Sequence, residues 1–90
     1  METTIISKEG KKVRASISWE HFRSRRPGYK VTQCTLITDT DEESIETTSL
    51  VKTSHASKDT ARKQALHAAL IKTIPTKDMR RQVWEVYLRK

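Results

Sequence analysis

Three stretches of the chain alternate between apolar and polar residues, a pattern typical of half-buried β-strands. In residues 12–22, one face carries Val13, Ala15, Ile17 and Trp19. Residues 29–38 and 45–53 form the second and third stretches, and the third is the least apolar. Because short loops separate the three, we expect an antiparallel meander with the third strand at an edge.

A different spacing follows the strands, with apolar residues three and four positions apart, and it predicts a helix. The residues concerned are Ala61, Ala65, Leu66, Ala69 and Leu70. Ser57 is a suitable N-cap, and Pro75 predicts that the helix ends near Thr73. Small side chains on this face would let the helix lie close to a sheet.

The two ends of the chain allow alternatives. Residues 3–7 fit either a short strand or an N-terminal extension. In residues 76–90, a helix capped by Thr76 would share one side among Met79, Val83, Val86 and Tyr87, whereas a strand would align Trp84, Val86 and Leu88. The cap favours the helix, and the apolar alternation favours the strand.

These elements predict one α+β domain over residues 1–90. It consists of a three-stranded antiparallel sheet packed on one helix (β-β-β-α), followed by a C-terminal helix or strand.

Charge is distributed unevenly along this sheet-and-helix pattern. The chain carries a net charge of +7, with +5 in residues 1–30, −4 in residues 31–57 and +6 in residues 58–90. Two basic segments therefore flank an acidic turn, and clustered basic surface is typical of nucleic-acid binding.

Several other classes of protein are disfavoured. The chain has no apolar run long enough to span a membrane and no secretory signal pattern, so we expect a cytoplasmic, intracellular protein without membrane contact. Its single cysteine, Cys34, lies in an apolar alternation and is expected to be a small buried residue.

Catalytic and metal-binding motifs are also missing. His21, His55 and His67 lack the paired spacing of a metal site, and the carboxylates of residues 39–46 lack the pattern of a calcium loop. No glycine-rich phosphate loop or hydrolase motif occurs. We therefore expect no enzyme activity, no cofactor and no metal.

Cations cluster instead at the start of the predicted helix, where Lys58, Arg62 and Lys63 follow Ser57. The helix dipole already makes this end positive, so added cations are unfavourable there unless an anion is bound. Unpaired N–H groups and cations together suit a phosphate, which predicts contact with a nucleic-acid backbone. His55, just before the helix, could add a donor.

Residues 57–66, SKDTARKQAL, resemble the start of the last helix in double-stranded-RNA-binding domains, which follows a three-stranded antiparallel sheet. The resemblance implies that Lys58 and Arg62 bind phosphates across a groove and that Ala61 and Ala65 pack on the sheet. The chain departs from that family in three ways: Asp59 replaces a lysine, the preceding loop lacks a glycine, and no first helix precedes the sheet. A C-terminal helix could take the place of that first helix.

A second resemblance is to the ribonuclease H fold, which runs β-β-β-α-β with a Pro-Gly-aromatic turn such as residues 26–29. It implies that the tail supplies a fourth strand. The carboxylates that hold the catalytic metal ions of that family have no counterparts here, so the resemblance implies no nuclease activity.

Two further basic clusters lie at the ends of the first predicted strand. Arg23, Arg25 and Arg26 stand in the loop beside aromatic residues, and Lys11 and Lys12 stand in the preceding turn. The rise of a strand separates the clusters by about 30 Å, so both could contact one duplex but not one phosphate.

Taken together, the residues predict a small nucleic-acid-binding protein that prefers structured or double-stranded RNA to DNA and makes mainly phosphate contacts. The alternative is a protein-binding inhibitor or adaptor, of the kind found in phages and mobile elements, that docks on an acidic partner. Exposed Trp84 and Tyr87 would favour that alternative. An edge strand could also pair with a partner or with a second copy.

Overall fold

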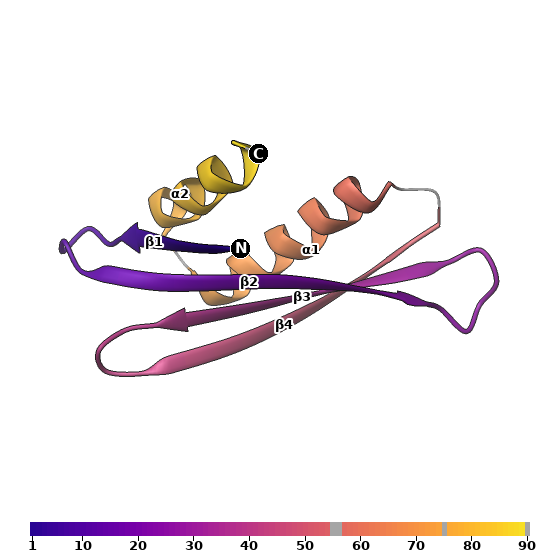
Figure 1. The fold of residues 1–90 in the computed structure, drawn as a ribbon, viewed down its shortest axis with the longest axis horizontal. Coiled ribbons are helices and arrows are strands. Elements are labelled where there is room, and N and C mark those ends of the chain that lie inside the picture. The colour runs from indigo at the N-terminus through magenta and orange to yellow at the C-terminus, as the bar shows by residue number, and fades with distance from the viewer. Residues whose placement is uncertain (55–56, 75, 90) are drawn as a thin grey trace.

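The computed structural model describes residues 1–54, 57–74 and 76–89. Within these residues the chain forms a sheet of four strands and two helices (Figure 1). Their order is β1 (Glu2–Ile6), β2 (Lys12–Arg23), β3 (Lys30–Asp39), β4 (Ser44–Thr53), α1 (Lys58–Thr73) and α2 (Lys77–Leu88). The α+β class and the antiparallel meander are therefore confirmed.

The predicted number of strands was wrong, because the N-terminal residues add β1 to the sheet. The strand order is β1-β2-β3-β4, with every neighbouring pair antiparallel. Ile5 of β1 pairs with Val13 and is fully buried. A strand of five residues with one buried position is too short for its alternation to distinguish it from an extension. β4 lies at the opposite edge, as its low apolar content indicated.

Both helices lie on one face of the sheet, and the other face carries no helix (Figure 1). The covered face of β2 bears Ala15 and Ile17, and that of β3 bears Cys34 and Leu36; all four are buried beneath the helices. Apolar Val31 and Ile37 of β3 belong to the opposite face, because they alternate with these buried positions. The face that the helices cover thus decides which apolar residues of a strand form the core.

α1 begins and ends where its sequence indicated. The hydroxyl of Ser57 accepts a hydrogen bond from the Thr60 N–H at 3.2 Å, which caps the first turn. The five predicted apolar residues, Ala61 and Ala65 among them, are buried on the sheet. The helix packs on β3 and β4 and ends at Thr73, and the N–H of the C-cap residue Ile74 bonds to the Leu70 carbonyl. Pro75 lies outside the described residues.

The tail forms a helix, α2, and not a strand. The side chain of Val83 in α2 is buried, and Met79, Trp84 and Tyr87 pack against the core. Thr76 precedes the helix, but its side chain makes no capping hydrogen bond. Residues 77–88 therefore add no strand to the sheet, in contrast to what the ribonuclease H resemblance implies.

The single thiol is part of the core. Cys34 is fully buried on the covered face of β3, and burial raises its pKa to about 11. Its position confirms the prediction of a small buried residue. Neither described helix combines the length and apolar character that a membrane span requires.

Candidate functional site

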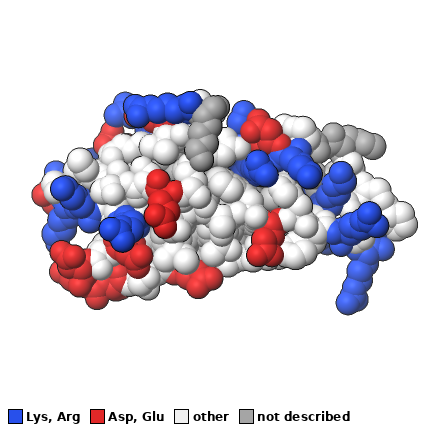
Figure 2. Space-filling model, in the orientation of Figure 1, with Lys and Arg blue, Asp and Glu red and all other residues white. Residues whose placement is uncertain are grey.

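Two of the predicted basic clusters lie at the same end of the molecule. β2 ends at Arg23, β3 begins opposite it at Lys30, and Lys30 in turn pairs with Thr53 at the end of β4. α1 starts at Lys58, five positions after Thr53, and therefore close to the β2–β3 loop. Lys and Arg side chains gather at this end of the surface, whereas both signs of charge mix at the opposite end (Figure 2).

The imidazole of His21 lies near enough to cations of this basic end to feel their charge. Its Nδ1 is 2.9 Å from the hydroxyl of Thr32, and its Nε2 is buried with no hydrogen-bond partner among the described residues. Burial lowers the pKa of His21, and the positive charges of Arg62, Lys58 and Lys30 lower it further. Cations from α1 and β3 therefore share one small region around this side chain.

An indole hydrogen bond holds the first turns of α1 against β2. Trp19 Nε1 donates to the Arg62 carbonyl at 3.2 Å. The ring centroids of Trp19 and of Tyr87 in α2 are 5.6 Å apart. The ring centroids of Tyr87 and Trp84 are 5.8 Å apart, in an edge-to-face arrangement. This aromatic cluster fixes the backbone that carries Arg62, while the Arg62 side chain remains exposed.

Asp59, which interrupts the basic pattern of the helix, has partners of its own. Its carboxylate lies 3.1 Å from Lys63 Nζ and accepts a hydrogen bond from the Tyr87 hydroxyl at 3.0 Å. These two contacts lower the pKa of Asp59. Lys63 is thus offset by Asp59, whereas no described carboxylate forms an ion pair with Lys58 or Arg62.

The loop between β2 and β3 supplies the remaining cations of the basic end. Arg25 and Arg26 are exposed in a turn in which the Tyr29 N–H bonds to the Arg26 carbonyl. Gly28 has a φ of 86°, a left-handed conformation that favours glycine at this point of the turn. Beside the turn is an open hollow of about 490 Å³. It is lined by Arg23, Ser24, Arg26, Pro27, Gly28, Tyr29, Lys30 and Ser54.

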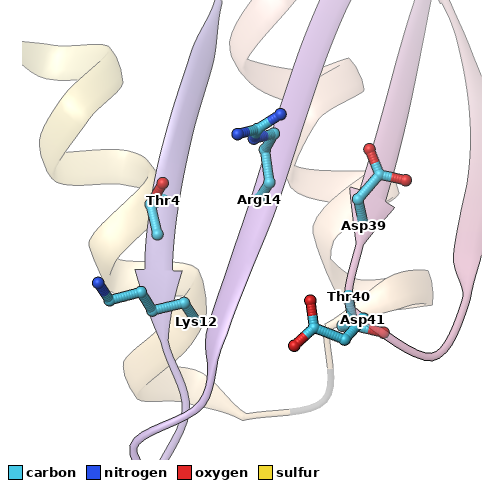
Figure 3. Close-up of a pocket in the computed structure, with 6 residues that line it drawn as sticks. All are labelled: Thr4, Lys12, Arg14, Asp39, Thr40 and Asp41. Atoms are coloured by element: carbon cyan, nitrogen blue, oxygen red, sulfur yellow. The ribbon is translucent and has the colours of Figure 1, made fainter.

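Lys11 and Lys12 do not join this basic end, because β2 separates them from it along the 47 Å length of the molecule. Lys12 and Arg14 line another open hollow together with Asp39 and Asp41 from the end of β3 (Figure 3). Cations and carboxylates face the same space there. The eight predicted residues therefore divide into a basic end and an end of mixed charge.

Sequence reasoning missed two residues of the basic end, His21 and Lys30. His21 continues the alternation of Val13, Ala15, Ile17 and Trp19, which could have placed it on the covered face. Lys30 offers no such signal, since only strand pairing brings it beside the start of α1. His55 lies outside the described residues, and His67 is exposed on α1.

Two other groups of residues bear on function. No cluster of His, Cys, Asp or Glu able to hold a metal ion occurs in the part of the chain that the structure describes. Trp84 and Tyr87 are partly buried and pack against the core. They are therefore not exposed aromatic anchors of the kind that would favour docking on a protein partner.

Comparisons with protein families, with curated proteins and with solved structures found no match to this chain.

Proposed function

We propose that the protein binds structured or double-stranded RNA, with phosphate groups held at the amino end of α1. The observation that carries the proposal is the convergence of Lys30, Lys58 and Arg62 around His21, with no described carboxylate paired to the α1 cations. Mutual repulsion makes such a cluster unfavourable in isolation, and a bound anion removes that cost.

The helix end itself suits an anion such as phosphate. A helix leaves its first N–H groups without intrahelical partners, and Ser57 satisfies only that of Thr60 by its side chain. Backbone donors, the positive end of the helix dipole and flexible cations then act on the same oxygens. The exposed arginines of the β2–β3 loop extend this surface and would contact neighbouring phosphates along the duplex.

The arrangement of the helices supports a duplex RNA ligand. The resemblance to double-stranded-RNA-binding domains requires a second helix, and α2 lies on the same face of the sheet as α1 (Figure 1). The Tyr87 hydroxyl joins α2 to the first turn of α1 through Asp59. Recognition through phosphates and helix shape would be weakly dependent on sequence.

The first experiment compares binding to an RNA duplex of about 20 base pairs, the matching DNA duplex and the single strands, each at low and physiological salt. We expect the RNA duplex to bind most tightly and its affinity to fall steeply with salt, because released counterions drive phosphate contacts. Absence of binding at low salt would exclude this function and direct the search to a protein partner.

Replacing the two unpaired cations tests the site. The double variant Lys58→Glu/Arg62→Glu should weaken RNA-duplex binding by at least about a hundredfold, because each of the two lost charged contacts is worth about 1.5–3 kcal/mol. Fluorescence anisotropy with a labelled duplex measures the change. Lys72→Glu/Lys77→Glu is the matched control, since it changes the net charge equally at exposed positions towards the other end of α1 and on α2. Equal losses in both variants would place the phosphates elsewhere.

A further inference from the structure

Large apolar side chains are exposed along one edge of the molecule. Ile45 and Leu50 of β4 are 44% and 61% exposed, and Ile71 of the overlying helix α1 is 53% exposed. β4 is one of the two edge strands, and no hydrogen bond joins its outer edge to another segment within the described residues. An edge strand of this kind offers a row of backbone donors and acceptors to another strand.

β4 also has the composition of a strand that pairs. Its ten residues, SIETTSLVKT, contain no proline or glycine and are rich in β-branched side chains. Its two charged residues, Glu46 and Lys52, have opposite signs and lie three positions on either side of Ser49. A strand with this symmetry is complementary to an antiparallel copy of itself.

We propose that β4 pairs antiparallel with β4 of a second copy of this chain, with each Ser49 opposite the other. In this register, Glu46 of each copy faces Lys52 of the other on the open face of the sheet, and Thr48 faces Leu50. On the covered face, Thr47 of each copy faces Val51. The dimer contains one continuous eight-stranded sheet, and both of its charged cross-strand pairs are attractive.

The position of α1 fits this pairing. α1 packs on β3 and β4, so its axis lies between them, half a strand spacing inside β4. Neighbouring strands are about 4.8 Å apart, so the α1 helix axis is about 5 Å from the two-fold axis that relates the two chains of the dimer. The axes of the two α1 helices are therefore about 10 Å apart. Helices in contact pack at 8–10 Å between axes, so the second helix fits without displacing the first.

The side of α1 that would face its copy has the spacing of a helix-packing surface. Asp59 contacts α2, and the Arg62 carbonyl accepts a hydrogen bond from β2, so one flank of α1 faces those elements. The opposite flank carries Gln64, Ala68 and Ile71, which are four and three positions apart. Because α1 packs on β3 and β4 while the first flank faces β2 and α2, this second flank is expected on the side of β4.

A small residue lies where the two helices would approach most closely. The hydroxyls of Thr73 and Thr47 are 2.6 Å apart, which sets the end of α1 level with Thr47. With rises of about 3.3 Å per strand residue and 1.5 Å per helix residue, Ser49 is level with Ala68. Ala68 would therefore meet its counterpart at the two-fold axis, and its methyl group permits close contact.

A charge swap tests both the dimer and its register. We expect sedimentation velocity across micromolar to millimolar concentrations to show a monomer–dimer equilibrium for the natural chain. Glu46→Lys or Lys52→Glu alone should weaken association by about tenfold, because each places like charges opposite one another. The double variant Glu46→Lys/Lys52→Glu should restore it. These side chains are exposed on the open face, so folding is unaffected.

Disulfide trapping provides an independent measure of the register. Mixing Thr48→Cys and Leu50→Cys chains under mild oxidation should give a cross-linked dimer, because directly opposed residues lie within disulfide range. Either variant alone should cross-link much less, because its introduced cysteines are diagonal to one another. A chain that stays monomeric at millimolar concentration, a double variant without restored association, or equal cross-linking in all three samples would overturn the proposal.

Discussion

At the scale of single residues, the most informative position is His21. Its ring is anchored by Thr32 on one side and lies among cations from α1 and β3. The lowered pKa means that the neutral imidazole is the form that folding favours. A phosphate bound by Lys58 and Arg62 would reverse that balance, since negative charge favours the imidazolium. His21 is therefore a natural reporter for occupancy of the basic end.

The pH dependence of stability follows from this lowered pKa. Because the unfolded chain binds a proton at His21 more readily than the folded chain, stability is fully present above the ordinary pKa of 6.5 and is lost as pH falls below it. Urea unfolding at about pH 7.5 and 5.5 should show this loss. His21→Gln should reduce the difference, whereas the surface control His67→Gln should not. An unchanged difference in His21→Gln would contradict the assigned environment.

NMR titration links the same residue to ligand binding. The His21 ring should titrate below 6.5 in the free protein, and its pKa should rise when duplex RNA is added. RNA binding that leaves the His21 pKa unchanged would separate the RNA surface from this cluster.

At the scale of the elements, the two edges of the sheet differ in whether another segment covers them. The side-chain amide of Gln82 in α2 accepts from the Ile6 N–H and donates to the Ile6 carbonyl, both at 2.9 Å. This side chain takes the place of a neighbouring strand at the edge of β1 and joins the two ends of the chain. β4 has no such cover in the described residues, which is why pairing with a second copy is proposed there and not at β1.

Removing the Gln82 amide should therefore destabilise the protein. Gln82→Ala loses two hydrogen bonds to the backbone, and we expect the free energy of unfolding to fall by about 1–2 kcal/mol. Urea unfolding measures it, with Lys77→Ala on the exposed side of α2 as control. If the two variants were equally stable, the contact between α2 and β1 would contribute nothing, contrary to the geometry.

At the scale of the whole molecule, charge is divided between the ends of an elongated body. The end that bears the start of α1 and the β2–β3 loop is basic, and the opposite end mixes Lys12 and Arg14 with Asp39 and Asp41 (Figures 2 and 3). A net charge of +7 therefore understates the field at one end and overstates it at the other.

This division predicts unequal contributions to RNA binding. Lys11→Glu/Lys12→Glu should weaken binding to duplex RNA less than Lys58→Glu/Arg62→Glu does, because nearby carboxylates already oppose phosphate at the mixed end. The salt dependence of affinity provides the measurement, since each lost phosphate contact reduces the slope by about 0.7–0.9. A larger effect from the Lys11 and Lys12 variant would mean that the main phosphate contact is at the end of mixed charge, contrary to the proposed site.

Much of the fold follows from local patterns in the sequence. The alternation in residues 12–22, the Ser57 cap and the alanine spacing of residues 61–69 were sufficient to place β2 and α1, because each depends on neighbours in the chain. They also placed Lys58 and Arg62 at the start of a helix. β1 and the choice between helix and strand for α2 depended on contacts across the chain, so their patterns allowed alternatives.

Local residue patterns were sufficient to predict the meander, the edge position of β4, the α1 helix with its buried alanines and the buried state of Cys34. In each case the period of apolar residues suffices, since burial selects one face of a strand or helix. Tertiary structure alone decided that Gln82 covers β1, that Asp59 engages Lys63 and Tyr87, and that Lys30 and His21 join the α1 cations. These contacts depend on strand pairing and helix placement between residues up to 76 positions apart, and no local pattern encodes such distances.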